Sequence, residues 1–183
     1  MKEVRYRFYL DYEKEEKCIN DMAVQGWHLE KWFLNRFTFT KGEPGAFTYR
    51  NEFLGAMSKQ EKQDYFELLK DSGITIIYEL GGWVYMKKVA AEGPFEIYTD
   101  TQSKINYYKR MLNILLYFFF INIFSVIMNG GLLIIYGNQS LLPEFISSGL
   151  PILNIVGASL IAIPIIKIIQ RKRALMKKKD LYE

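Results

Sequence analysis

Two long stretches of the chain, at 111–143 and 145–166, contain no charged residue. A helix that spans a bilayer needs roughly 20 apolar residues, because the hydrocarbon layer is about 30 Å thick. Both stretches are long enough. The sequence therefore predicts a membrane protein with two spanning helices.

These spans divide the chain into parts with different surroundings. The expected order is a soluble domain at 1–100, a connecting helix at 101–110, a first span at 111–136, an external loop at 137–144, a second span at 145–169 and a basic tail at 170–183. No linker rich in Gly, Ser or Pro separates the soluble domain from the first span, so we expect one helix to run from the connector into the membrane.

Charge is distributed unevenly between the two parts. Residues 1–100 hold 14 Lys and Arg against 17 Asp and Glu, whereas residues 101–183 hold 10 against 3. The net charge of +4 therefore describes a membrane flank, and it argues against a nucleic-acid partner.

The basic residues predict the orientation in the membrane. Three lie before the first span, seven follow the second, and none lies between the spans. Lys and Arg of short loops favour the cytoplasmic side, so both termini are expected in the cytoplasm. The seven tail residues are expected to contact anionic lipids of that leaflet; a docking patch for an acidic partner is the alternative. They are Lys167, Arg171, Lys172, Arg173, Lys177, Lys178 and Lys179.

Residue spacing predicts an α+β soluble domain. Alternation indicates strands at 4–10, 47–53, 74–78 and 83–87, and one long or two short strands at 27–39. Helical spacing indicates helices at 12–25 and from Ser58 to Ser72. Ser58 and Glu61 have the spacing of a capping box, and Gly81-Gly82 has the composition of a hairpin turn. This order predicts a ferredoxin-like antiparallel sheet with two helices on one face, followed by the two-helix transmembrane hairpin.

Several short strings together resemble a known family. They are Gly26-Trp27-His28-Leu29, Gly42-Glu43-Pro44-Gly45, Gly81-Gly82-Trp83-Val84-Tyr85 and Phe95-Glu96-Ile97-Tyr98-Thr99-Asp100. Over roughly residues 1–110 the chain resembles the bacterial domain-of-unknown-function family 2812, small membrane-anchored proteins often encoded beside PadR-like regulators. The resemblance implies a bacterial inner-membrane location and a regulatory or stress context. It carries over no catalytic residue.

The residues needed for catalysis or metal binding are scarce. His28 and Cys18 are the only residues of their types, whereas a structural zinc site usually takes four such ligands. No glycine-rich phosphate loop is present. The carboxylates at 13–16 are expected on the solvent side of their helix. We therefore expect no metal, no cofactor and no enzyme activity. The remaining catalytic hypothesis is a Ser-His-Asp or Cys-His mechanism that uses His28.

Aromatic residues are frequent on neighbouring predicted strands, and most are expected to pack under the helices. Some of them, with one arginine, are expected to form a face for a ligand or partner. This candidate face comprises Trp32, Tyr49, Arg50, Trp83 and Tyr85.

Small and amide side chains recur in the two spans. Such residues let membrane helices approach and form hydrogen bonds. The spacing predicts helix packing or oligomerisation through Asn122, Asn129, Asn154, Ala158 and Ala162.

Together these features predict a non-catalytic sensing or protein-interaction module anchored at the membrane, with a protein partner or a homo-oligomer. The alternatives are an accessory subunit of a membrane complex such as an exporter, and a small membrane enzyme using His28.

Overall fold

The computed structural model describes residues 1–33, 35–98, 100–136 and 149–182. The chain divides into two compact units, residues 1–99 and 100–183, and each is described by itself. The loop expected at 137–144 lies outside the described residues.

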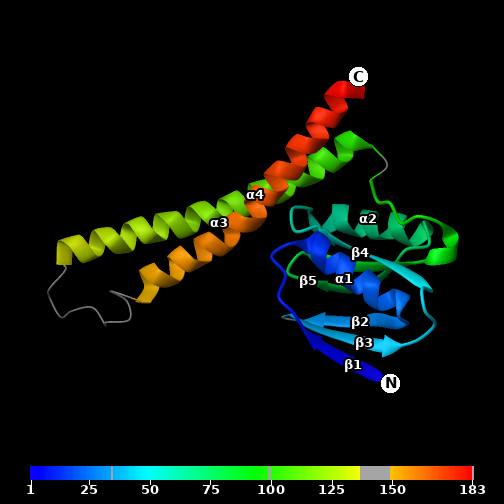
Figure 1. The fold of residues 1–183 in the computed structure, drawn as a ribbon. Coiled ribbons are helices and arrows are strands. Elements are labelled where there is room, and N and C mark those ends of the chain that lie inside the picture. Colours follow the sequence, from blue (N-terminus) through cyan, green and yellow to red (C-terminus); the bar gives the residue numbers. More distant parts are fainter. Residues whose placement is uncertain (34, 99, 137–148, 183) are drawn as a thin grey trace. The chain divides into compact units, whose positions relative to one another are not determined.

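The first unit is built from six strands and two main helices (Figure 1). They are β1 (Lys2–Tyr6), α1 (Tyr12–Val24), β2 (Trp27–Phe33), β3 (Arg36–Lys41), β4 (Phe47–Phe53), α2 (Lys59–Asp71), β5 (Thr75–Leu80) and β6 (Trp83–Val89), followed by a short 3-10 turn, η1 (Ala90–Glu92). Asp11 caps α1, and the expected capping box of Ser58 and Glu61 begins α2.

The strands form two antiparallel sheets of three strands. Sheet A has the order β1-β3-β2, and sheet B has the order β4-β6-β5. Strands β2 and β5 contact each other, so the two sheets meet at these strands. The α+β class and the antiparallel pairing agree with the sequence prediction.

The first unit contains a tandem repeat that the sequence analysis did not detect. The order β1-α1-β2-β3 is followed by β4-α2-β5-β6, and a shift of 47 residues converts the bounds of α1, 12–24, into those of α2, 59–71. The pairing Val4↔Thr38 becomes Asn51↔Tyr85 under the same shift. The two halves therefore have the same strand register.

Irregular positions of the backbone also repeat. The ladder of β2 and β3 shifts register between Leu29 and Lys31, and the ladder of β5 and β6 shifts between Ile76 and Tyr78, 47 residues later. Residues with a left-handed backbone conformation also occupy equivalent positions in the two halves. Gly26 (φ 80°) is equivalent to Gly73 (φ 76°), and Asn35 (φ 65°) is equivalent to Gly82 (φ 84°). Matching bulges and turns show that the two halves have one fold.

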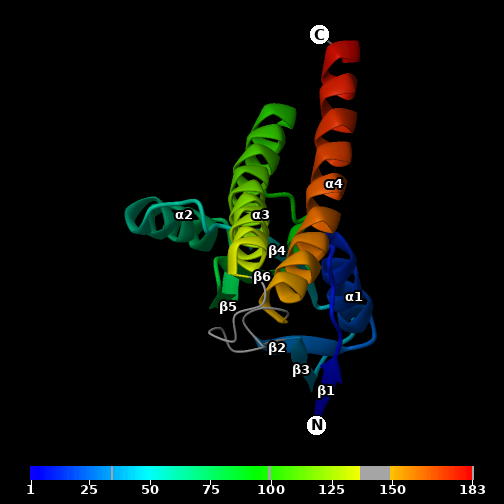
Figure 2. The ribbon, with the colours of Figure 1, turned by 90° about the vertical axis from the view of Figure 1, so that its left-hand side faces the viewer.

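Helices α1 and α2 lie on opposite sides of sheet B (Figure 2). Tyr85 of β6 packs in a core cluster with α1, whereas its neighbours Val84 and Met86 pack with Leu69 of α2. Successive side chains of a strand point to opposite faces. The structure thus corrects the expected single ferredoxin-like sheet with both helices on one face, because each helix belongs to its own repeat.

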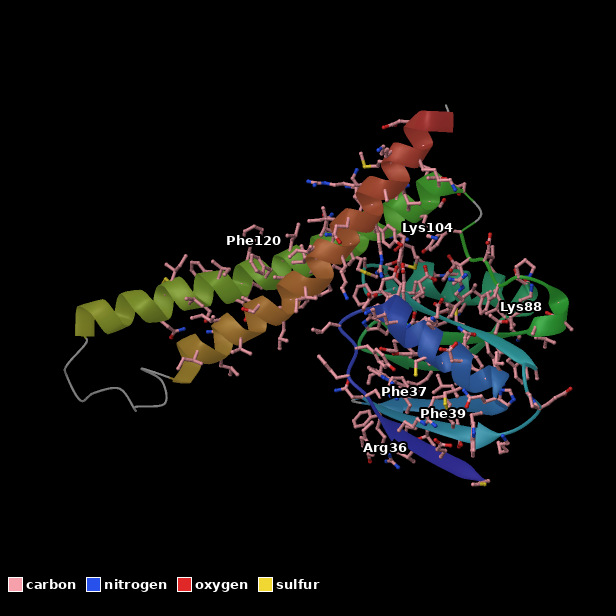
Figure 3. The ribbon with its side chains drawn as sticks, in the orientation of Figure 1. Arg36, Phe37, Phe39, Lys88, Lys104 and Phe120 are labelled. Atoms are coloured by element: carbon pink, nitrogen blue, oxygen red, sulfur yellow. The ribbon has the colours of Figure 1, made fainter. Side chains whose placement is uncertain are left out.

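The core of sheet A lies between β3 and α1. Phe37 and Phe39 of β3 pack with Ile19 and Met22 of α1, and all four side chains are buried (Figure 3). Burying a side chain of this size stabilises a fold by roughly 1.5–3 kcal/mol. These contacts position α1 over the sheet.

The second unit is a pair of long helices, α3 (Thr101–Tyr136) and α4 (Leu150–Tyr182), which contact each other along their length. The Asp100 carboxylate accepts from the Ser103 backbone N–H at 2.7 Å at the start of α3. Hydrogen bonding from the Ser103 side chain, and secondly from its backbone N–H, lowers the pKa of Asp100. Helix α3 continues from the expected connector into the apolar stretch, and the basic residues of the expected tail lie on α4.

Candidate functional site

Helix α1 covers the outer edge of β4. The Asn20 Nδ2 donates to the Tyr49 carbonyl oxygen at 2.9 Å, and the Tyr49 N–H donates to Asn20 Oδ1 at 2.8 Å. One turn earlier on α1, Glu16 Oε2 accepts from the Asn51 N–H at 3.2 Å. Residues four apart on a helix lie on one face, so Glu16 and Asn20 bind the exposed backbone groups of an edge strand.

Arg50 completes this contact region. Its Nη1 donates to Glu16 Oε1 at 3.1 Å, and its Nε donates to the Phe95 carbonyl oxygen at 2.9 Å. Burial raises the pKa of Glu16, and the nearby Arg50 charge opposes that rise. The arginine expected in a ligand-binding face therefore contacts the protein itself.

A second carboxylate of α1 is buried beneath the helix. Glu15 is 8 % exposed, and its Oε1 accepts a hydrogen bond from the Tyr85 hydroxyl. Burial raises the pKa of both groups, and the Glu15 charge raises that of Tyr85 further. Trp32 stacks on Tyr85 with ring centroids 5.3 Å apart. Glu15, Tyr85 and Trp32 thus link α1 to both sheets.

His28 of β2 contacts Glu43 and Tyr49. Its Nε2 lies 2.8 Å from the Glu43 carbonyl oxygen, and its Nδ1 lies 3.2 Å from the Tyr49 hydroxyl. A carbonyl oxygen can only accept a hydrogen bond, so Nε2 is the donor to Glu43 O. In the neutral ring with this tautomer, Nδ1 is an acceptor, and the Tyr49 hydroxyl can donate to it. Burial raises the pKa of Tyr49 to about 12, so this hydroxyl stays protonated at neutral pH.

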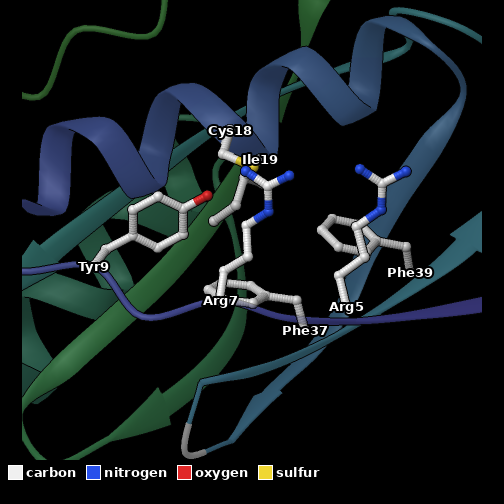
Figure 4. Close-up of a pocket in the computed structure, with 7 residues that line it drawn as sticks. All are labelled: Arg5, Arg7, Tyr9, Cys18, Ile19, Phe37 and Phe39. Atoms are coloured by element: carbon white, nitrogen blue, oxygen red, sulfur yellow. The ribbon is translucent and has the colours of Figure 1, made fainter.

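A small pocket lies between α1 and sheet A (Figure 4). The Tyr9 hydroxyl points toward Cys18, and the Arg5 and Arg7 side chains extend over the rings of Phe39 and Phe37. Ile19 completes the lining. The space admits about one water molecule. This pocket is too small for a metabolite.

The candidate aromatic face is mostly internal. Tyr49 and Tyr85 are each 2 % exposed, and Trp32 is partly buried on Tyr85. Trp83 lies between Tyr12 and Phe53, with centroid distances of 5.7 and 5.4 Å. The structure brings these residues near one another through α1 and sheet B, and it uses them in packing.

Sequence reasoning missed the roles of Glu15 and Glu16. Both were expected on the solvent side of the helix, whereas the structure places them against sheet B. One signal was present: Glu15, Ile19 and Met22 follow the i, i+4, i+7 spacing of a buried stripe. Among the described residues, no group of three His, Cys, Asp or Glu side chains could hold a metal ion.

Polar residues of the second unit bond within the helix pair. The Asn154 Nδ2 of α4 donates to Ser125 Oγ of α3 at 2.7 Å, and the Asn129 Nδ2 donates to the same oxygen at 3.2 Å. Asn122 donates to Phe118 O on its own helix at 2.9 Å, and its Oδ1 lies close to Gly157. Of the two alanines of the expected packing face, Ala158 is buried and Ala162 partly buried.

The seven basic residues predicted to contact lipid lie on the C-terminal half of α4, and Lys179 Nζ donates to Gln102 Oε1 at 3.0 Å. This contact places the end of α4 beside the start of α3, so the unit is a hairpin. The side-chain view shows Phe120 on the outer side of α3, where it is 63 % exposed (Figure 3).

Comparison with known protein families identifies the family to which the chain belongs. Residues 11–120 match a protein-family model described as "Protein of unknown function (DUF2812)". No curated protein and no solved structure matches the chain significantly.

Proposed function

Because the chain belongs to the DUF2812 family, whose function is unknown, we propose its role from its own structure: a non-catalytic protein-interaction module held at a bacterial membrane. The observation that carries the proposal is the hairpin of two long apolar helices whose side chains stay largely exposed. Its two candidate spans are Thr101–Gly131 and Ile152–Asp180.

Membrane insertion explains that exposure. Only 6 % of the apolar window of the first helix and 17 % of that of the second are buried. A core helix of a soluble protein would be mostly buried, and a signal sequence would lie near the N-terminus; neither description fits these helices. Apolar side chains that face hydrocarbon need no protein partner.

The distribution of charge supports a cytoplasmic domain. Ten Lys and Arg residues flank the two apolar stretches on the terminal sides, and none lies at 137–143 between them. Short-loop positive charge favours the cytoplasm, so both termini lie there in this proposal. The basic end of α4 then meets the anionic leaflet, where each charge adds about 1 kcal/mol of attraction.

The contacts of the soluble unit favour protein interaction over ligand sensing. The aromatic residues of the expected binding face pack inside the unit, and Arg50 forms an ion pair with Glu16. The pocket at Cys18 admits about one water molecule. Both ring nitrogens of His28 have partners, which weakens the enzyme hypothesis. The amides of the hairpin bond within it, which weakens the accessory-subunit hypothesis.

The anchoring is tested by cysteine labelling in intact bacterial cells. In a Cys18→Ser background, single cysteines replace Lys104, Ser140 or Lys178, and a membrane-impermeant maleimide is added from outside. We expect labelling of Ser140→Cys alone, and of all three after the cells are opened. Extraction of the chain by alkaline carbonate, or outside labelling at 104 or 178, would contradict the proposal.

A further inference from the structure

Three of the four outer strand edges of the first unit are already covered. The edges of β2 and β5 face each other, and Asn20 and Glu16 of α1 bind the edge of β4. The remaining edge belongs to β1, which ends sheet A. Strand β1 is the repeat counterpart of β4. Among the described residues of this unit, however, no element binds the edge of β1 as α1 binds the edge of β4.

The hydrogen bonds of β1 show which backbone groups face outward. Met1 O accepts from the Lys41 N–H, and the Arg7 N–H donates to Asn35 O, both at 3.0 Å and both toward β3. Bonding directions alternate along an antiparallel strand. The N–H and C=O groups of Lys2, Val4 and Tyr6 therefore point away from the sheet, and no hydrogen bond within the described residues reaches them.

This edge has few of the usual devices that block strand pairing. Edge strands are commonly protected by proline, by a bulge or by charged side chains, lysine above all. Strand β1 contains no proline and pairs with β3 in unbroken register. It carries three charged residues, and each has an ion-pair partner within the chain: Arg5 pairs with Glu3, and Lys2 pairs with Glu30. Val4 is 39 % and Tyr6 72 % exposed.

We propose that β1 binds β1 of a second copy of this chain in an antiparallel pair centred on Val4. Val4 then lies opposite the partner's Val4, and Lys2 lies opposite the partner's Tyr6. Each of these outward-facing residues exchanges both backbone hydrogen bonds with its counterpart. The pair has two-fold symmetry, so it closes as a dimer.

Charge complementarity favours a second copy of the chain as the partner of β1, and it favours this register. On the face toward α1, Glu3 lies opposite the partner's Arg5, and Arg5 lies opposite the partner's Glu3. Within one chain, Arg5 Nε and Glu3 Oε1 already form an ion pair at 2.6 Å. Dimerisation joins two such pairs into a square of alternating charges, and opposite charges across strands stabilise pairing.

The inference deepens the proposed interaction role, because it names a second copy as the partner. It does not depend on the orientation of the helices, since β1 lies in the first unit. A failure of dimerisation with correct maleimide labelling would reject this inference alone.

Disulfide trapping tests the register in full-length protein in native membranes. In the Cys18→Ser background we compare Val4→Cys with Thr38→Cys, because Thr38 lies opposite Val4 on β3, one strand further from the proposed interface. Paired residues have Cα atoms about 5.5 Å apart, within disulfide range, whereas the two Thr38 residues would lie roughly 14 Å apart across three strand spacings. We expect a covalent dimer from Val4→Cys and none from Thr38→Cys. Equal trapping of both, or of neither, would overturn the proposal.

Charge exchange provides the second test and separates lost pairing from lost folding. Glu3→Arg makes positions 3 and 5 of each strand both positive, and Arg5→Glu makes both negative, while Lys2 is unchanged. Each variant alone should lose the Val4→Cys dimer. Co-expression of the two, distinguished by tags, should restore a mixed dimer, which a misfolded variant could not form. Failure of the mixed pair, or unchanged self-association of either variant, would contradict the proposed register.

Discussion

Asn20 and Tyr49 form a two-point contact between a helix side chain and the backbone of an edge strand. The amide of Asn20 both donates to and accepts from Tyr49, at 2.9 and 2.8 Å. Its geometry resembles the pairing of another strand, because one side chain supplies a donor and an acceptor to a single residue. Helix α1 thereby takes the place of a fourth strand in sheet B.

Loss of this amide should destabilise the first unit. Asn20→Ala leaves a partly buried N–H and a C=O of Tyr49 without partners, at a cost of roughly 1–3 kcal/mol for a buried group. We expect a lower urea midpoint for the first unit, measured by tryptophan fluorescence. Asp21→Ala is the matched control, since Asp21 is exposed on the next position of α1. Equal effects of the two substitutions would show that the contact contributes nothing specific.

Glu15 should make stability depend on pH. Burial raises its pKa in the folded state above the unfolded value. Its contribution to stability is therefore fully present below the unfolded pKa and is lost as pH rises through the raised folded pKa. Glu15→Gln removes this loss while keeping an oxygen to accept from Tyr85.

The expected result is a higher melting temperature for Glu15→Gln than for the parent at pH 8, with the difference shrinking toward pH 4. Some pH dependence should remain, because the pKa of Glu16 is raised as well. Thermal melts across this range measure both effects. A constant difference between the two proteins at all pH values would contradict the assignment to Glu15.

The sequence predicted individual elements well because alternation and capping are local signals. The capping box at Ser58 and the turn at Gly81-Gly82 appear where expected. The repeat went undetected because only Gly26/Gly73 and Lys41/Lys88 are identical between residues 2–41 and 49–88. What persists is apolar character at core positions: Ile19/Phe66, Met22/Leu69, Leu29/Ile76, Phe37/Val84 and Phe39/Met86.

The candidate site was harder to predict than the elements. Tyr49, Arg50 and Tyr85 were identified as a group from neighbouring strands, but strand patterns do not show which partner covers a strand edge. That partner is α1, and its Glu16 and Asn20 resemble ordinary solvent-exposed residues in sequence. Their role arises from a contact between two repeats, which no local pattern encodes.

The repeated left-handed glycines allow a comparison between the two halves. Gly26 and Gly73 have nearly the same φ, but a Cβ on Gly26 would lie 2.8 Å from the Gly42 backbone oxygen, whereas one on Gly73 would meet the flexible carboxylate of Glu92. Alanine costs about 1–2 kcal/mol at either position through its left-handed conformation. We expect Gly26→Ala to be clearly the more destabilising in urea unfolding, since a backbone atom cannot move aside. A larger effect of Gly73→Ala would contradict this steric argument.

Within the hairpin, Asn154 and Ser125 should be energetically coupled. Asn154→Ala removes the 2.7 Å hydrogen bond between α4 and α3. Interhelical hydrogen bonds in membranes contribute roughly 0.6–2 kcal/mol. A double-mutant cycle with Ser125→Ala, measured by SDS unfolding in mixed micelles, should give a coupling energy in this range. Ser159→Ala is the control, because Ser159 donates only to Ile155 O of its own helix at 2.8 Å. Coupling to Ser125 that is as large for Ser159 as for Asn154 would mean that the effect comes from general loosening of α4 rather than from this bond.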